Sequence, residues 1–241
     1  MANHKPEVRV YPPGYGHTPL TADYRPWHTD VDFLTAWTAV RDRTLVDQPR
    51  LYELWELTEQ ALKVPGTFLE VGTWRGGSAA LMGLRLKHLG AHRPLVIADT
   101  FSGVAKAGPH DPYYEGGEHS DTDLDTVTAF LHSLDLSNFR LLSGVFPEDT
   151  AHHVPDETIA LCHIDVDVHN SAQGVFEWVV PRIPLGGIIV FDDYGFFGCE
   201  GVTRFVHELR ARDDVCVIAN VNGHAVVVKT HTRTRERHDE P

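Results

Sequence analysis

Four aspartates stand directly after two apolar runs of the chain and could bind a metal ion. Asp165 and Asp167 follow the run IALCHI, and Asp192 and Asp193 follow the run IIVF. If both runs are parallel strands, their carboxyl ends meet on the side of the sheet where ligands bind. Four carboxylates gathered there would repel one another strongly unless a cation lay among them. Oxygen ligands without a Cys/His cluster suit a hard ion, first Mg²⁺ and then Mn²⁺ or Ca²⁺.

A plainer alternative makes each aspartate pair a helix cap and a surface turn. Asn170 and Ser171 can cap the following helix by themselves, which leaves Asp165 and Asp167 free and favours the metal site. We interpret the neighbouring His163 as a strand residue and His169 as a candidate substrate contact.

The segment FLEVGTWRGG at residues 68–77 indicates a nucleoside-cofactor site. It is an apolar strand, a glycine-bearing turn and the start of a helix, which lets a ligand approach the backbone and free N–H groups. A dinucleotide site would need a glycine where Trp74 stands, and Glu70 would repel a pyrophosphate. The pattern favours the E-x-G turn of class I methyltransferases, which faces a cationic methionine moiety. The alternative is a turn that only packs strand on helix.

The next predicted strand ends in Asp99, within LVIADTF. A carboxylate at this place accepts hydrogen bonds from the ribose hydroxyls of a nucleoside, although it can instead cap the following turn. Together with Glu70 and Gly72, it predicts S-adenosylmethionine as the cofactor.

A sheet must bring these residues together, and the chain alternates strand and helix after residue 66. The expected fold is α/β: a doubly wound, mainly parallel, Rossmann-like seven-stranded sheet of the class I methyltransferase type. Strands are expected at 68–71, 95–98, 140–142, 159–164, 188–191, 215–219 and 225–228, and helices at 78–89, 124–134, 172–180 and 202–210.

The N-terminal part predicts a helical arm. A proline-rich stretch to about residue 29 precedes one helix from the cap Asp30 to Val40 and a second at about 49–62. The long polar segment 102–122 is typical of a lid. We expect one methyltransferase domain over 1–241, with the arm and helices at 1–62, the core at 66–229 and a frayed tail at 230–241.

The composition indicates a small-molecule enzyme. The chain has 241 residues, 42% hydrophobic and 23% charged, with a net charge of −13 and no basic stripe before Arg233, which disfavours nucleic acid. Three scattered cysteines exclude a disulfide framework. No leader-like or membrane-spanning apolar run is present, so we expect a cytoplasmic protein without a membrane partner.

Five segments occur in an order and spacing that resemble one family: FLEVGTWRGGSA, VIADTFSG, LLSGVFPEDT, LCHIDVDVHNSA and GGIIVFDDYGFFGCEGV. From about Thr44 to Arg210 the chain is similar to the TylF/MycF/NovP family, the macrocin-type O-methyltransferases of antibiotic sugar biosynthesis. The resemblance implies a homo-oligomeric, Mg²⁺-dependent enzyme that methylates a deoxysugar hydroxyl on a glycosylated natural product or nucleotide-sugar.

The resemblance also implies roles for particular residues. Asp165, Asp192 and Asp193 would hold the metal, and Asp167 would be the general base. The cofactor would contact Thr44, Glu70, Gly72, Thr73, Ser78, Asp99, Ser102, Gly144 and Asp165.

One departure from the family leaves the substrate class open. The chain has DVDVHN at 165–170 where the family usually has D-G-D-L-Y-E, and its N-terminal arm has no clear match. A catechol-like phenol would need the same chelation, in a pocket lined from Trp27, Trp37, Tyr113, Tyr114, Phe196 and Phe197. The alternatives from other classes are a cephalosporin-hydroxylase-type enzyme, which shares this sheet, and a non-catalytic binding module.

Overall fold

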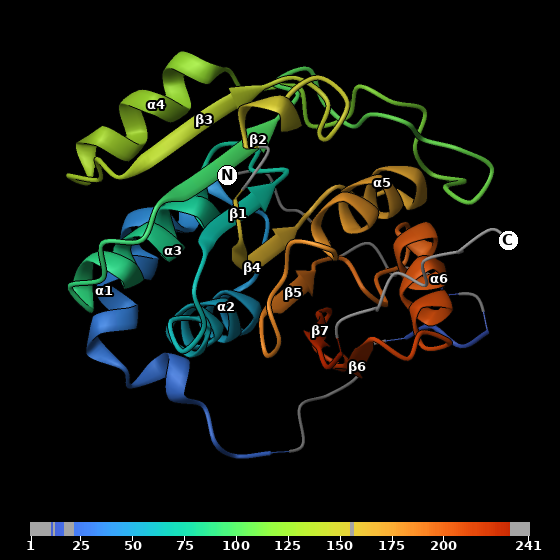
Figure 1. The fold of residues 1–241 in the computed structure, drawn as a ribbon, viewed down its shortest axis with the longest axis horizontal. Coiled ribbons are helices and arrows are strands. Elements are labelled where there is room, and N and C mark those ends of the chain that lie inside the picture. Colours follow the sequence, from blue (N-terminus) through green and yellow to red (C-terminus); the bar gives the residue numbers. More distant parts are fainter. Residues whose placement is uncertain (1–10, 12, 17–21, 155–156, 232–241) are drawn as a thin grey trace, which may run out of the picture.

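A seven-stranded sheet forms the centre of the molecule in the computed structural model, which describes residues 11, 13–16, 22–154 and 157–231. The strand order is β3-β2-β1-β4-β5-β7-β6 (Figure 1). The strands are β1 Thr67–Val71, β2 Leu95–Asp99, β3 Phe139–Ser143, β4 Ile159–Ile164, β5 Ile188–Phe191, β6 Val215–Ala219 and β7 Ala225–Lys229. All seven predicted strands are confirmed, each within one residue at either end.

The pairing places the candidate residues on one edge. Strands β1 to β5 pair in parallel, whereas β7 pairs antiparallel with both β5 and β6. The chain leaves β1 toward β2 on one side and returns to β4 on the other. In such open sheets ligands bind at this reversal, outside the carboxyl ends of the strands. Strands β1 and β4 are buried along their whole length, as expected for parallel strands covered on both faces.

In the described part of the chain, α-helices cover both faces of the sheet (Figure 1). They are α1 Val31–Val40, α2 Gln48–Ala61, α3 Gly77–His88, α4 Leu124–Ser133, α5 His169–Val179 and α6 Glu200–Leu209. Apolar side chains of α1 to α4 form one core cluster with the sheet, and those of α5 and α6 form a second. The predicted cap is confirmed, because Asp30 accepts a hydrogen bond from Phe33 N at 2.9 Å. Helix α2 starts slightly earlier than expected, after its own cap, Asp47.

The start of α5 corrects one prediction. The helix begins at His169, and the expected capping by Asn170 and Ser171 is wrong. Asp111 Oδ1 accepts the His169 N–H at 2.9 Å, while Ser171 Oγ donates to the Ala105 carbonyl at 2.7 Å. The cap therefore comes from a loop about 60 residues away, which the local pattern could not reveal.

That loop is the segment 102–122, between β2 and α4. Its two arms pair through the bonds Val104 N to Glu118 O, 2.8 Å, and Gly117 N to Val104 O, 2.9 Å. Thr122 Oγ1 donates to the Trp74 carbonyl, and so ties the end of the segment to the turn after β1. No helix in the described part of the chain combines the length and apolar character that a bilayer span needs.

Candidate active site

A cavity of about 450 Å³ opens at the carboxyl edge of β1, β2, β4 and β5. It is within the size range of sites for small molecules and cofactors. Its walls come from the strand ends, from residues 44–50 before and at the start of α2, and from the segment 102–122. Seven of the residues predicted to contact the cofactor line it: Thr44, Gly72, Thr73, Ser78, Asp99, Gly144 and Asp165.

Gly72 explains why the turn after β1 can reach the cavity. Its φ is +85°, a region that disfavours other residues, and a Cβ there would lie 1.7 Å from the Asp165 carbonyl oxygen. A side chain would therefore push the turn away from the end of β4.

Asp99 clamps the same turn with its carboxylate. Its Oδ2 accepts hydrogen bonds from Thr73 N at 2.7 Å and Trp74 N at 2.9 Å, and its Oδ1 accepts one from Phe101 N at 2.7 Å. The carboxylate is thus held rigidly by backbone donors at the wall of the cavity. Carboxylate oxygens have about four lone-pair sites in all, so acceptor capacity remains for a ligand hydroxyl.

Two predicted cofactor residues do not line the cavity. Glu70 is fully buried behind the turn, where it accepts a hydrogen bond from Thr73 Oγ1 at 2.5 Å and lies 2.9 Å from His163 Nδ1. Ser102 is exposed, and its N–H donates to Thr100 Oγ1 at 3.1 Å. Glu70 therefore acts on the turn through Thr73, whereas the resemblance implied that it contacts the cofactor.

The structure brings the four aspartates together at the floor of the cavity. One ligand oxygen each of Asp165, Asp192 and Asp193 lies within 4.8 Å of the others, and Asp193 also groups with Asp167. Burial and then the neighbouring carboxylates raise the pKa values of Asp165 and Asp193 well above the usual range. The protein therefore supplies too little positive charge to keep Asp165 and Asp193 ionised together without a further cation.

Asp192 differs from its neighbours because two cationic side chains contact it. Its Oδ2 accepts a hydrogen bond from Arg50 Nη1 at 2.6 Å, and its Oδ1 lies 2.8 Å from His224 Nε2. Burial alone would raise the pKa of Asp192, but the Arg50 guanidinium and His224 outweigh burial and lower it to about 2. Asp192 is therefore ionised across the physiological range.

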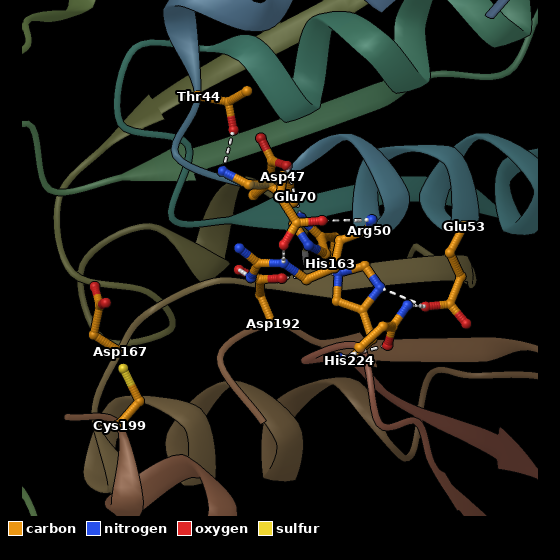
Figure 2. A network of polar contacts seen from close by, with 12 residues as sticks. Thr44, Asp47, Arg50, Glu53, Glu70, His163, Asp167, Asp192, Cys199 and His224 are labelled. Atoms are coloured by element: carbon orange, nitrogen blue, oxygen red, sulfur yellow. Dashed lines mark hydrogen bonds and ion pairs between the residues drawn. The ribbon is translucent and has the colours of Figure 1, made fainter. Parts of the chain in front are cut away.

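The polar network around Asp192 was not predicted from the sequence (Figure 2). Arg50 is held by Asp47 Oδ2 at 2.9 Å and lies over the Phe196 ring, 4.4 Å from its centre. His224 Nδ1 lies 2.8 Å from Glu53 Oε2. Burial disfavours the charged form of His224, but Asp192 and Glu53 outweigh it and raise its pKa to about 9. The one available signal was the spacing of Arg50 and Glu53, which puts both on one face of α2.

Asp167 lies beside this cluster in a strained turn, with φ at +64°. Its Oδ1 accepts a hydrogen bond from the Tyr114 hydroxyl at 2.7 Å, and Tyr114 belongs to the segment 102–122. Burial and the Asp167 charge raise the pKa of Tyr114, so this hydroxyl stays protonated as a donor. Burial raises the pKa of Asp167, and the Tyr114 hydrogen bond opposes that rise.

One further sequence prediction is wrong, and another holds only in part. His169 does not line the cavity but packs between the rings of His110, at 4.8 Å, and Phe205, at 5.6 Å, because it forms the buried first turn of α5. Of the six aromatic residues suggested for a pocket, only Tyr114 and Phe196 line it. The other four pack elsewhere: Trp27 and Trp37 against the N-terminal core, and Tyr113 and Phe197 against each other.

The donor set fits a hard divalent cation. Its three grouped carboxylates supply only oxygen atoms, and buried Asp193 Oδ2 has no hydrogen-bond partner among the described residues. Mutual repulsion of Asp165 and Asp193 would be relieved by a bound cation.

The protein has a Rossmann-like α/β sheet with an E-x-G turn, a carboxylate at the end of β2 and a cavity at the reversal point. These features define the class I S-adenosylmethionine-dependent methyltransferases. Residues 33–229 match the family described as macrocin-O-methyltransferase (TylF). The chain therefore belongs to this family of S-adenosylmethionine-dependent O-methyltransferases.

Characterised relatives agree with this assignment. A tetracenomycin enzyme of Streptomyces olivaceus, 8-demethyl-8-(2,3-dimethoxy-alpha-L-rhamnosyl)-tetracenomycin-C 4'-O-methyltransferase, is 30% identical over 85% of this chain and 81% of its own. Mycinamicin III 3''-O-methyltransferase of Micromonospora griseorubida is 31% identical over 71% and 72%. Demethyldecarbamoylnovobiocin O-methyltransferase of Streptomyces niveus is 29% identical over 71% and 69%.

Solved structures show the same fold. The O-methyltransferase NovP superposes with a TM-score of 0.68 at 25% identity, covering 78% of this chain and 83% of its own. The calicheamicin methyltransferase CalS11 gives 0.67 at 19% identity, over 82% and 84%. The predicted fold class is confirmed.

Proposed function

We propose that this protein is a Mg²⁺-dependent O-methyltransferase that methylates a sugar hydroxyl of a natural product, where a second hydroxyl lies on the adjacent carbon. The observation that carries the proposal is the meeting of Asp165, Asp192 and Asp193 in the cavity that the donor turn also lines. The names of the three relatives support the substrate class, since each names a natural product and one names its rhamnosyl group.

The metal would be held by Asp165, Asp192 and Asp193. When bound, a divalent ion lowers the pKa of a coordinated hydroxyl and so makes a poor nucleophile more reactive. The raised pKa values of Asp165 and Asp193 are the property of this chain that favours such an ion, because a bound cation would stabilise their ionised forms.

Asp167 would take the proton from the attacking hydroxyl. Tyr114 fixes its Oδ1 at 2.7 Å, which leaves Oδ2 for the substrate. A positioned base of this kind contributes about 10²–10⁴ in rate.

The methyl donor would lie against the turn after β1, where Asp99 would accept hydrogen bonds from the ribose hydroxyls. The segment 102–122, anchored on α5 and on Trp74, would cover the reacting groups and exclude water. The oxygen, the methyl carbon and the sulfur must then lie in line, and the shared cavity supplies this proximity.

A catechol-like phenol is the second candidate substrate, because Tyr114 and Phe196 present aromatic rings to the cavity. A panel of nucleotide-sugars, glycosylated natural products and catechols, incubated with labelled S-adenosylmethionine and Mg²⁺, tests the proposal. Transfer to a vicinal-diol sugar supports it. Transfer to catechols alone would replace the sugar with a phenol, and donor binding without any transfer would indicate a binding module. A cytoplasmic location and a homo-oligomeric state complete the proposal, and size-exclusion chromatography with light scattering tests the latter.

A further inference from the structure

A second group of metal-ligand side chains lies beneath the acidic cluster, on the side of α2. His163, Asp192 and His224 each offer one ligand atom within 4.8 Å of the others, and all three side chains are at most 3% exposed. Among the described residues, His163 Nε2 has no hydrogen-bond partner, and His224 Nε2 and Asp192 Oδ1 lie 2.8 Å apart as an ion pair without hydrogen-bond geometry. Buried polar atoms normally have a well-aligned partner, so this group needs an explanation.

Both imidazoles are oriented from behind by a carboxylate (Figure 2). His163 Nδ1 lies 2.9 Å from Glu70 Oε1, and His224 Nδ1 lies 2.8 Å from Glu53 Oε2. A carboxylate on Nδ1 fixes the proton there and leaves the Nε2 lone pair for a ligand. This carboxylate–histidine pairing is the usual outer arrangement of protein metal sites.

Asp192 is oriented in the same way. Arg50 Nη1 holds its Oδ2 at 2.6 Å and leaves Oδ1 facing His224. His224 Nε2 and Asp192 Oδ1 are 2.8 Å apart but are not aligned as a hydrogen bond. A tetrahedral ion with bonds of about 2.0 Å would hold these two atoms about 3.3 Å apart, so a small outward shift of either side chain would admit it. The competing occupant is a proton, which would make His224 an imidazolium paired with Asp192 and Glu53.

We propose that His163, His224 and Asp192 bind a divalent transition-metal ion, with Zn²⁺ as the first candidate. Two imidazole nitrogens and one carboxylate suit Zn²⁺, Co²⁺, Ni²⁺ or Fe²⁺, whereas Mg²⁺ prefers oxygen ligands alone. The ion would join β4, the end of β5 and the start of β7, and through Glu53 and Arg50 also α2. Its role would be to hold Asp192 in place, and this site does not depend on the proposed methyl transfer.

Retention of Zn²⁺ by the purified full chain tests the proposal. The protein is stripped with chelator, equilibrated with Zn²⁺, passed through a desalting column and analysed for metal by mass spectrometry. We expect one Zn²⁺ per chain, and loss of this ion in His163→Asn and His224→Asn. Glu53→Gln, which alters only the outer partner, should weaken Zn²⁺ about 10–100-fold. His152 and His153 give the matched control, because they are exposed and lie next to each other outside the proposed site. Their double alanine variant should retain the ion.

Two further measurements distinguish the proposed zinc site from the alternatives. Asp165→Asn removes a ligand of the proposed Mg²⁺ site only, so it should retain Zn²⁺, and its loss of Zn²⁺ would place the ion among the carboxylates and overturn the proposal. If the histidine variants do not fold, X-ray absorption of the Zn²⁺-loaded wild type replaces them and should show two imidazole ligands. Absence of retained Zn²⁺ in the wild type, or a spectrum without imidazole, would overturn the proposal and leave the ion pair with Asp192 as the role of His224.

Discussion

The carboxylates on the two sides of the cavity differ in how far the protein stabilises their ionised forms. On the donor side, Asp99 is matched by three backbone N–H groups of its own chain, at 2.7–2.9 Å. On the acidic side, Asp165 and Asp193 face other carboxylates, and their pKa values are raised by burial and by those charges.

The difference shows which side is complete without a ligand. On the donor side, backbone hydrogen bonds already hold the Asp99 carboxylate in place, and only a ligand hydroxyl has to be added. On the acidic side, Arg50 and His224 pair with Asp192, and the protein supplies too few cations to keep Asp165 and Asp193 ionised as well. A cation there would supply what the sequence does not, which is the physical basis of the proposed metal requirement.

The largest expected effect separates the two members of the D-x-D pair. Asp167→Asn removes the proton acceptor and leaves the metal ligands, so kcat should fall by about 10²–10⁴ and added Mg²⁺ should not restore it. Asp165→Asn should also lose activity, but part should return at high Mg²⁺. Rates at saturating Mg²⁺ for both variants decide this, and rescue of Asp167→Asn instead would reverse the two roles.

Asp214 shows how a fully compensated carboxylate behaves outside the cavity. It lies 2.8 Å from Arg212 Nε and 2.9 Å from Lys229 Nζ, and hydrogen bonds from both lower its pKa. Asp214→Asn should therefore destabilise the fold by about 3 kcal/mol at pH 7.

The pH dependence of this effect has a defined sign. A depressed folded-state pKa gives stability that is present above the unfolded value, ~3.9, and is lost as the pH falls through the folded value. The difference in melting temperature between wild type and Asp214→Asn should thus be constant near neutrality and shrink in acid. A gap that widened in acid would contradict this assignment.

On the donor side, Asp99→Ala should weaken S-adenosylmethionine binding more than the chemical step. Its hydrogen bonds to the ribose exist before and during transfer, and such charged bonds contribute about 1.5–3 kcal/mol. Calorimetry should show a roughly tenfold or larger rise in the donor Kd. Ser102→Ala, a change at an exposed residue near the same turn that does not line the cavity, is the control and should leave the Kd unchanged. An unchanged Kd for Asp99→Ala would remove Asp99 from the donor site.

The smallest expected effect is a gain in thermal stability when a proposed metal ligand is replaced. In EDTA, Asp193→Asn should be more stable than wild type, because it removes the free-energy cost of burying a carboxyl group, either protonated or ionised, beside other carboxylates. Relief of about 1 kcal/mol would raise Tm by roughly 2–4 °C. Added Mg²⁺ should stabilise the wild type and leave the variant nearly unchanged. A lower Tm for the variant in EDTA would mean that the cluster is compensated already.

Sequence patterns predicted the sheet well because apolar runs, glycine turns and strand-end aspartates are local signals. The convergence of Asp165 and Asp192 followed from parallel strands alone. Interactions across the fold were not accessible in this way. Glu53 and His224 are 171 residues apart and meet only because β7 lies beside β5 near α2. The cap from Asp111 and the burial of His169 depend on how the segment 102–122 folds back, which no local spacing encodes.

The most direct test of the central claim is the methyl-transfer rate as a function of divalent metal. The enzyme, freed of metal with EDTA and desalted, is assayed with labelled S-adenosylmethionine and an accepted acceptor while Mg²⁺ is titrated. Because the protein supplies too few cations to keep Asp165 and Asp193 ionised, we expect negligible transfer without metal and a saturable return of activity with Mg²⁺. Full activity in metal-free buffer would contradict the metal role of Asp165, Asp192 and Asp193.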